Sequence, residues 1–197
     1  MSAHGGNTFI PLNIAVLTVS DTRTEENDTS GQALVDRLTA AGHLLADRAI
    51  VIDDVYQLRA KVSQWIADES IQAIISTGGT GFTARDNTPE ALSPLFDKAV
   101  EGFGEIFRHV SLLEIGTSTI QSRALGGIAN KTLVLCVPGS TNACKTAWDK
   151  IISEQLDASH KPCNFIPHLK LASAPLMVNQ PPTMADAASI EPCKSRG

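Results

Sequence analysis

The chain has 197 residues, of which 43% are apolar and 19% charged, and its formal net charge at neutral pH is −5. This length and apolar content are enough for one ordinary core and exclude two large domains. No basic run exceeds two residues, which argues against nucleic-acid binding, because that function needs a stripe of Lys and Arg to neutralise phosphates.

The sequence predicts a soluble cytoplasmic protein without a membrane partner. No apolar stretch approaches the roughly 18 residues that a membrane span requires. The first ten residues lack the charged start and the apolar stretch of a signal peptide. The four cysteines have no paired spacing and fit reduced thiols better than a disulfide framework. They are Cys136, Cys144, Cys163 and Cys193.

In the first half of the chain, apolar runs alternate with helical patterns. Asn13 to Val19 predicts a buried strand, and Leu44 to Ile52 and Ile71 to Ser76 predict a second and a third strand. After the first strand we expect a helix that is capped by Asp28 or Ser30 and stopped by Gly42. Its apolar face holds Ala33, Leu34, Leu38 and Ala41, and the face of the next helix holds Leu58, Val62, Trp65 and Ile66.

The second half continues this alternation. Asn87 or Thr88 caps a helix with Pro89 at its first position, and a further helix runs from about Gly104 to Leu113. Thr132 to Val137 predicts another buried strand. Ser140 then caps a helix with one apolar face, formed by Ala143, Ala147, Trp148, Ile151 and Ile152. Such alternation is typical of a doubly wound α/β fold, with a mostly parallel sheet and helices on both faces.

The expected organisation is one domain with two terminal extensions. Residues 1–8 are interpreted as a flexible start, 9–170 as the domain and 171–197 as a mostly disordered tail rich in Pro, Ala and Ser. His160, Cys163 and His168 are interpreted as part of a polar segment leaving the domain. A metal site there is disfavoured because no fourth ligand is evident.

The loop Thr77-Gly78-Gly79-Thr80-Gly81 follows the third predicted strand. In an open α/β sheet, ligands bind beyond the carboxyl ends of the strands. Three glycines let the backbone approach an anion, and the hydroxyls of Thr77 and Thr80 could assist. The loop lacks the Lys-Ser or Lys-Thr of a Walker motif. A phosphate cradle and a plain turn that needs positive φ are equally compatible with these residues.

Acidic residues lie near this loop. Asp86 follows it by five residues, and Asp53-Asp54 ends another predicted strand. Carboxylates beside a phosphate indicate a bridging cation, since Mg²⁺ is commonly held by one or two carboxylates and phosphate oxygens. Each acid alone could equally be a loop or capping residue.

A second strand-to-helix turn, Pro138-Gly139-Ser140, offers another anion seat. Capping alone would explain Ser140 equally well. Arg123 and Lys145 are candidate counter-charges, or solvated surface residues. Two phosphate-type turns and acids on one sheet edge favour a metal-assisted site for two phosphates.

The stretch from Gly78 to Glu90, GGTGFTARDNTPE, resembles the signature of the MoaB/MogA family of molybdenum-cofactor biosynthesis proteins, and the MoaB branch matches best. Matching pieces recur in order over roughly residues 9–170. They are Ser20-Asp21-Thr22-Arg23, Asp28-Thr29-Ser30-Gly31, Asp53-Asp54, Gly102-Phe103-Gly104-Glu105, Ser122-Arg123 and Pro138-Gly139-Ser140.

The resemblance implies a fold shared with the gephyrin G domain, assembly as a trimer or hexamer, and binding of molybdopterin. Active members use Mg²⁺ and ATP to adenylylate the terminal phosphate of molybdopterin, with release of pyrophosphate. By position, Asp53 and Asp86 match the acids associated with Mg²⁺ and catalysis, and we expect Asp86 to be essential. The implied phosphate- and ligand-binding residues are Thr77, Gly78, Gly79, Thr80, Gly81, Ser20, Asp21, Pro138, Gly139, Ser140, Ser122 and Arg123.

The chain departs from the family pattern at Glu101, where many members have Pro, and at Thr119 and Gln121, where many have Ala and Leu. These changes are similar to those in MoaB proteins that coexist with MogA. The three departures favour a protein that binds molybdopterin without catalysis, but the leading hypothesis is a molybdopterin adenylyltransferase. The alternative is a non-catalytic protein that binds or carries molybdopterin, and the retained Asp53 and Asp86 favour the enzyme.

Overall fold

The computed structural model describes residues 8–171 of the chain. The flexible start expected at residues 1–8 and the disordered tail expected at 171–197 lie outside the described residues, except for residue 8 and residue 171.

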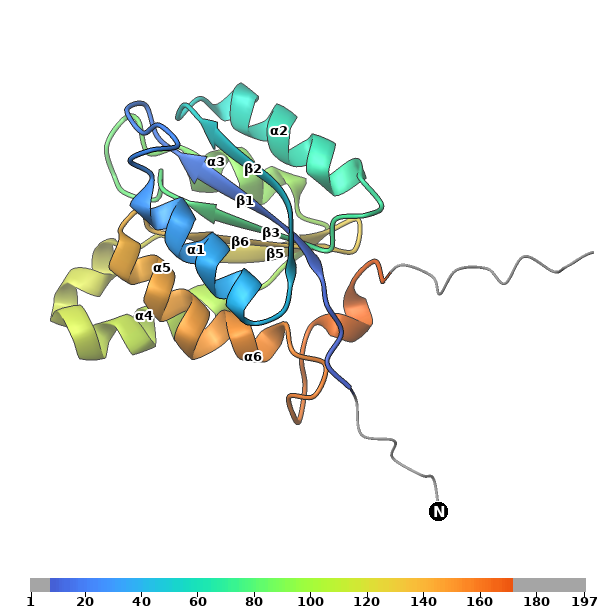
Figure 1. Cartoon of the computed structure of the whole chain (residues 1–197). Coiled ribbons are helices and arrows are strands. Elements are labelled where there is room, and N and C mark those ends of the chain that lie inside the picture. The colour runs from blue at the N-terminus through green and yellow to red at the C-terminus, as the bar shows by residue number, and fades with distance from the viewer. Residues whose placement is uncertain (1–7, 172–197) are drawn as a thin grey trace, which may run out of the picture.

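The described chain folds around one six-stranded sheet (Figure 1). The strands are β1 (Asn13–Val19), β2 (Leu44–Val51), β3 (Ala73–Thr77), β4 (Lys98–Ala99), β5 (Leu125–Ala129) and β6 (Thr132–Val137), in the order β2-β1-β3-β6-β5-β4. β2, β1, β3 and β6 are parallel, whereas β5 and β4 are antiparallel to their neighbours. The four parallel strands therefore end at the same edge of the sheet.

Helices cover both faces of the sheet (Figure 1). They are α1 (Thr29–Ala40), α2 (Val55–Ala67), α3 (Thr88–Leu92), α4 (Glu101–Ile115), α5 (Thr141–Ala147) and α6 (Ser153–Gln155), the last two joined through a wider turn at Trp148–Ile152. Alternate residues of β1 point into two separate cores. Ile14 and Val16 pack with α1, α4 and α5, while Ala15 and Leu17 pack with α2 and α3. The expected three-layer α/β/α fold is confirmed.

The apolar runs predicted the inner parallel strands β1, β3 and β6 well because these strands are buried on both faces, whereas the edge strand β2 has no buried residue. The run at Asn13–Val19 matches β1 residue for residue, and the run at Thr132–Val137 matches β6. Asp28 and Ser140 cap their helices as expected, by accepting hydrogen bonds from the amides of Gly31 and Ala143.

The sequence did not predict β5, because this strand contains Gly126 and Gly127, and glycine is uncommon inside strands. The structure gives a steric reason for these glycines. A Cβ on Gly127 would lie 2.2 Å from the ring of Phe96, and one on Gly126 would lie 2.8 Å from Leu135 Cδ2. The aromatic ring of Phe96 thus occupies the space that a side chain at position 127 would need.

Other boundaries also differ from expectation. α4 begins at Glu101 rather than near Gly104, and Pro89 is the second residue of α3 rather than the first. Ala41 is an exposed residue after α1 and does not share its buried face. The segment from Leu156 to Leu169 does not leave the domain, because four of its residues are buried in the core, namely Leu156, Ala158, Ile166 and Leu169.

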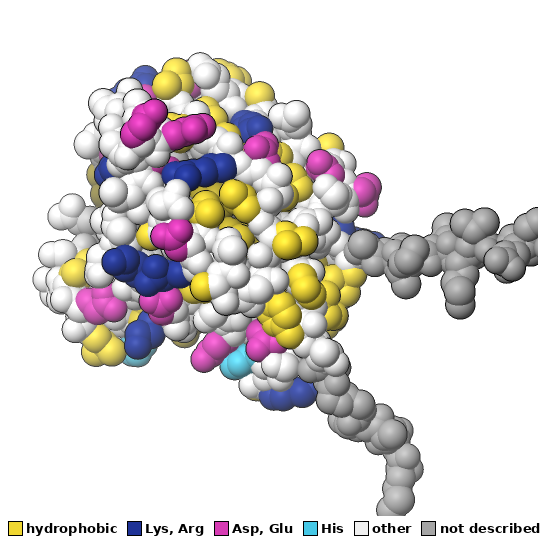
Figure 2. All heavy atoms as spheres, in the orientation of Figure 1, with side chains coloured by type: hydrophobic (Ala, Val, Ile, Leu, Met, Phe, Trp, Pro, Cys, Tyr) yellow, Lys and Arg dark blue, Asp and Glu magenta, His cyan; other side chains and the backbone are white. Residues whose placement is uncertain are grey.

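Charges of both signs are interspersed on the face that carries α1 and α5, and no stripe of one sign runs across it (Figure 2). One contact there joins the two helical segments, an ion pair of 2.9 Å between Arg37 of α1 and Asp149. Within residues 8–171, no helix is both long enough and apolar enough to cross a membrane.

Candidate functional site

The candidate site lies at the carboxyl edge of the parallel strands. The chain moves outward from β1 to β2 and then crosses to β3 on the other side of β1. Such a reversal creates the crevice where open α/β sheets bind ligands. The loops after β1, β2, β3 and β6 all extend from this edge (Figure 1).

A hollow of about 440 Å³ opens at this edge. The glycine loop Gly78–Gly81, Asp86 and the turn Pro138-Gly139 form one part of its lining. Ile115, Ser118, Gln121 and Ser122 form the other part. Ile115 ends α4, Ser118 and Gln121 belong to the following 3₁₀ segment Gly116–Gln121, and Ser122 comes directly after it. The hollow therefore has a backbone-rich polar side and a side-chain wall.

The glycine loop has the backbone conformation that its sequence suggests. Gly78 has φ of 101° and Gly79 has φ of 64°, both in the region that favours glycine. A Cβ on Gly78 would lie 2.3 Å from the carbonyl oxygen of Val19. The carbonyl groups of Gly78 and Gly79 accept hydrogen bonds of 2.9 Å from the hydroxyl and the amide of Thr88. Thr88 therefore holds the loop by donating hydrogen bonds to two of the loop's carbonyl oxygens.

The loop amides are placed differently from its carbonyl groups. Among the described residues, no backbone carbonyl accepts a hydrogen bond from the amide of Gly79 or Thr80. Successive amides of this kind form anion-binding concavities in proteins. The structure thus combines the two interpretations of the sequence, since the tight turn is also a backbone surface that can take an anion.

Thr77 joins the two turns. Its hydroxyl donates a hydrogen bond of 3.0 Å to the carbonyl oxygen of Pro138 and lies 3.1 Å from Cys144 Sγ. The side chain is fully buried. A Cβ on Gly139 would be 3.1 Å from Gly78 Cα, so the two turns also touch directly. The role of Thr77 in phosphate binding stays a prediction.

Asp53 lies directly against the glycine loop and is only 5% exposed. A Cβ on Gly79 would be 2.6 Å from Asp53 Oδ2, and Asp53 Oδ1 accepts a hydrogen bond of 3.0 Å from the Asn87 amide. Burial raises the pKa of Asp53, the hydrogen bonds from Asn87 oppose this, and the nearby charges of Asp86 and Asp21 raise it further. Its pKa lies above the ordinary value as a result.

Asp54 has the capping role that the sequence left open for both acids of the pair. Its carboxylate accepts hydrogen bonds from the amides of Tyr56 and Gln57 at the start of α2. The two neighbouring acids therefore differ in function: Asp54 caps a helix, while Asp53 faces the glycine loop.

Asp86 borders the other end of the loop. A Cβ on Gly81 would lie 2.8 Å from Asp86 Oδ2, and the same oxygen accepts a hydrogen bond of 2.8 Å from the Thr83 amide. The Thr83 hydrogen bond is the main reason that the pKa of Asp86 lies below its ordinary value. The structure thus brings Asp53 and Asp86 to one loop, with pKa values displaced in opposite directions.

Ser20 and Asp21 organise the loop after β1. The Ser20 hydroxyl accepts hydrogen bonds from the amides of Thr22 and Arg23. Asp21 accepts from the Arg85 guanidinium at 2.9 and 2.6 Å and from the Asp53 amide at 3.0 Å. The Arg85 contact is the main cause of the lowered pKa of Asp21. Asp21 therefore links three loops of the site, and sequence reasoning had not identified Arg85 as its partner.

The two candidate counter-charges have different places. Lys145 does not line the hollow and instead borders another one of about 430 Å³, together with Glu25 and Glu26. Arg123 lies beside the glycine loop, and its guanidinium donates to the carbonyl oxygens of Gly81 and Asp86. Of the two, only Arg123 is brought to the site.

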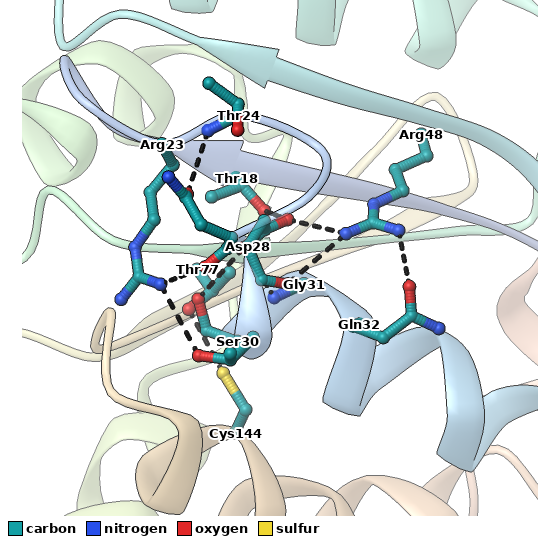
Figure 3. Close-up of polar contacts among 12 residues, drawn as sticks. Thr18, Arg23, Thr24, Asp28, Ser30, Gly31, Gln32, Arg48, Thr77 and Cys144 are labelled. Carbon is teal, nitrogen blue, oxygen red and sulfur yellow. Dashed lines mark hydrogen bonds and ion pairs between the residues drawn. The ribbon is translucent and has the colours of Figure 1, made fainter.

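A second polar cluster lies behind the site, under the start of α1 (Figure 3). Asp28 is its centre and is 2% exposed. Its carboxylate accepts hydrogen bonds from Thr18, the Gly31 amide and Arg48, at 2.7, 2.9 and 2.9 Å. Because its partners come from β1, α1 and β2, this cluster holds three elements together beneath the loops.

Comparison with known proteins gives the family of this domain. Residues 15–158 match the family model described as a probable molybdopterin binding domain. The chain is 60% identical over 162 residues to molybdenum cofactor biosynthesis protein B of Escherichia coli (strain K12), covering 82% of this chain and 95% of that protein.

Solved structures of molybdenum and tungsten cofactor proteins have a similar fold. A crystal structure of a molybdenum cofactor biosynthesis protein B has 42% identity and a TM-score of 0.73, covering 75% of this chain and 92% of that one. The tungsten cofactor synthesizing protein MoaB from Pyrococcus furiosus has 36% identity and a TM-score of 0.67, covering 73% and 92%.

Proposed function

The chain belongs to the MoaB/MogA family of molybdenum cofactor biosynthesis proteins, and from this we propose that it binds molybdopterin at the glycine loop and adenylylates it. In the proposed reaction, an oxygen of the terminal phosphate of molybdopterin attacks the α-phosphorus of ATP. The bond between the α- and β-phosphates breaks, pyrophosphate leaves, and molybdopterin-AMP remains.

The observation that carries this proposal is the pairing of a backbone anion seat with two acids. The amides of Gly79 and Thr80 face no backbone acceptor among the described residues, while Asp53 and Asp86 touch the loop at Gly79 and Gly81. A phosphate alone would be repelled by these carboxylates. The arrangement suits a phosphate that arrives with a cation.

The residues at the loop fit Mg²⁺, which prefers oxygen ligands and commonly takes only one or two carboxylates in addition to phosphate oxygens. Asp53 and Asp86 would hold it. The ion would supply charge neutralisation for the phosphates, the main requirement of phosphoryl-type transfer. Among residues 8–171 no group of three or more His, Cys, Asp and Glu side chains is arranged to hold a metal ion.

The polar residues around the hollow would orient the two substrates. Gly78–Gly81 and the turn Pro138-Gly139 offer backbone groups on one side, and Ser122 and Gln121 lie on the other. Asp21 would fix the loop that carries Arg85 and would tie it to Asp53. Positioning of this kind accounts for most of the rate in reactions that need little covalent help from the protein.

The alternative function is non-catalytic molybdopterin binding, which the departures from the family pattern favour. Their places in the structure weaken that argument. Glu101 lies at the start of α4, and the buried Thr119 donates a hydrogen bond of 3.1 Å to the Arg108 carbonyl group. Of the three departures, Gln121 alone lines the hollow. The two acids are both retained, and a passive carrier has no need of them.

Self-association as a trimer or hexamer is part of the proposal. Exposed apolar side chains on α4 and just after it support it, because contiguous patches of this kind mark interaction surfaces. They are Ile106, Leu112, Leu113, Ile115 and Ile120, with Leu113 80% exposed. Size-exclusion chromatography with light scattering is expected to show an oligomer at micromolar concentration, and a clean monomer would contradict this part of the proposal. The expected partners are thus molybdopterin, a nucleotide and further copies of the chain, in the cytoplasm.

The direct test is to incubate the purified protein with molybdopterin, Mg²⁺ and ATP and to measure molybdopterin-AMP and pyrophosphate. We expect Asp86→Asn to lower turnover by about 100-fold, since that factor equals about 2.7 kcal/mol of transition-state stabilisation and a metal ion supplies several kcal/mol. Molybdopterin binding should persist in this variant. Tight binding without product in the wild type would establish the carrier function instead.

A further inference from the structure

Arg123 lies between the 3₁₀ segment Gly116–Gln121 and β5, and its side chain is 23% exposed. Its guanidinium reaches across to the loop that follows β3. Nε donates to the Gly81 carbonyl oxygen at 2.8 Å, and one terminal nitrogen donates to the Asp86 carbonyl oxygen at 2.6 Å. The other terminal nitrogen pairs with the Glu90 carboxylate.

These three acceptors span the segment that carries Asp86. Gly81 and Asp86 are the two ends of a six-residue loop, and Glu90 lies in α3, which follows it. Inside the loop, the hydrogen bonds between Thr83 and Asp86 close a local turn. A local turn shapes the loop but does not fix its position relative to the sheet, whereas Arg123 connects both ends of the loop to β5.

Other contacts hold the loop less firmly or at one point. The ion pair of Arg85 with Asp21 is more exposed, with side-chain exposures of 59% and 38%, and exposed ion pairs contribute little. The Asn87 amide donates to Asp53, which holds the loop only at its end. Arg123 is therefore the main side-chain contact across the loop.

Each nitrogen of the guanidinium also has a partner within the protein. Its three nitrogens donate to protein acceptors, and its central carbon lies 5.2 Å from the centroid of the Phe82 ring. The edge of the guanidinium thus donates to protein acceptors, and its face lies over the Phe82 ring. Arg123 is also not among the residues that line the hollow beside the glycine loop, so its contacts serve the loop rather than a ligand in that hollow.

We propose that Arg123 is a positioning residue, which sets Asp86 and Gly81 against the rest of the glycine loop, and that it is not a phosphate ligand. This inference rests on the proposed function, because it assigns Arg123 a role in the same site. Only Arg can make the contacts, because they come from three nitrogens in one plane, whereas Lys has a single nitrogen.

The substitutions Arg123→Lys and Arg123→Ala separate the two roles. For a positioning residue, both variants lose kcat by about 100-fold, the cost of misplacing a group by about 1 Å, and the KM for molybdopterin changes little. For a phosphate ligand, Lys would retain much of the affinity through its charge, while Ala would raise the dissociation constant of molybdopterin at least about tenfold. The second pattern would overturn the inference.

Arg59 offers a matched control. Its guanidinium also donates to backbone carbonyl groups, those of Ala91 and Glu90, at 3.1 and 3.0 Å. It makes these contacts from α2, and it does not touch residues 81–86. Arg59→Lys is therefore expected to leave kcat and KM near the wild-type values. An equal loss in this variant would mean that any Arg near α3 matters, and would overturn the specific role of Arg123.

A second readout is independent of turnover. Amide hydrogen exchange in the segment 81–90 should become faster in Arg123→Lys and should stay unchanged in Arg59→Lys. Glu90→Gln, which removes the negative charge of one of the three acceptors and spares the other two, should give a smaller increase and serves if Arg123→Lys unfolds. Unchanged exchange in every folded variant would overturn the inference. If exchange behaves as expected but the wild type forms no molybdopterin-AMP, the proposed adenylyl transfer fails while the positioning role stands.

Discussion

Two buried carboxylates, Asp28 and Asp53, lie close to the same sheet edge but have opposite surroundings. Their exposures are similar, 2% and 5%, so burial alone does not distinguish them. Burial would raise the pKa of Asp28, but the hydrogen bonds from Arg48, Gly31 and Thr18 outweigh this and lower it (Figure 3). The fold therefore compensates the charge of Asp28 within the protein.

Asp53 has no such compensation. The hydrogen bonds that it accepts come from Asn87, and its nearest charged neighbours include two further acids, Asp86 and Asp21. Its pKa is raised because burial and the neighbouring acids favour its protonated form. A carboxylate in this state beside the glycine loop is characteristic of a group that meets a cation or a proton during function. The difference separates an acid that stabilises the fold from an acid available for chemistry.

The largest expected effect is on folding, at Asp28. Removing one partner of a buried ion pair costs about 3–5 kcal/mol, because the other charge is left buried. We expect Asp28→Asn to lower the free energy of unfolding by about 3 kcal/mol, at the low end of this range, since Arg48 is 20% exposed. Urea denaturation measures the change.

Asp149→Asn is the matched control, because its ion pair with Arg37 is surface-exposed, at 49% for the Asp149 side chain. Its expected loss is below about 1 kcal/mol. Equal losses in the two variants would mean that Asp28 has no special structural role.

The second effect is on activity, at Asp53. Asp53→Asn should lower turnover by about 100-fold, which corresponds to about 2.7 kcal/mol, because it removes one of the two proposed Mg²⁺ ligands. Its stability should stay equal or rise, since a like-charge repulsion is relieved. The neighbouring Asp54→Asn should keep turnover, because Asn also caps helices well. If Asp53→Asn instead destabilised the protein as Asp28→Asn does, the contrast between the two acids would disappear.

The third effect concerns the backbone of the glycine loop, which Asp53 and Asp86 both contact. Gly78→Ala should destabilise the protein by about 1–3 kcal/mol, the cost of holding a non-glycine residue in strained backbone. A Cβ there would also lie 2.3 Å from the Val19 carbonyl oxygen. The midpoint temperature of thermal unfolding and the affinity for molybdopterin should both fall. Gly102→Ala, in α4 with no atom within 4 Å of the added Cβ, should change neither; an equal loss there would refute the steric explanation.

The smallest effect is on the pH dependence of stability. The lowered pKa of Asp28 gives stability that is present above its unfolded value of 3.8 and is lost as pH falls through the folded pKa. The raised pKa of Asp53 gives the reverse, stability that is present below 3.8 and lost as pH rises through the folded pKa. Urea unfolding over a pH series should therefore show the advantage of wild type over Asp28→Asn shrinking in acid.

The difference in free energy of unfolding between wild type and Asp53→Asn should change with pH in the opposite direction. Raising the pH from 3.8 should make wild type progressively less stable relative to Asp53→Asn. Parallel curves for the two variants would contradict the assignment of opposite environments.

Local sequence determined much of the fold. The runs that became β1, β3 and β6 are mostly apolar, because parallel strands inside an α/β sheet are buried on both faces. Ser140 was recognisable as a cap and Asp28 as one of two candidates, since capping depends on a hydrogen bond to an amide two or three residues later. The glycine loop was recognisable because its positive φ values need glycine.

Only the tertiary structure decided which polar residues act together. The sequence could not show that Asp53 faces the loop while Asp54 caps a helix, because the two neighbours differ only in what other elements place beside them. Nor could it show that Arg123 spans the loop from Gly81 to Asp86, a contact across 42 and 37 residues of chain. The residue types and loop conformations are thus set locally, whereas the charge compensation that separates Asp28 from Asp53 arises from contacts distant in sequence.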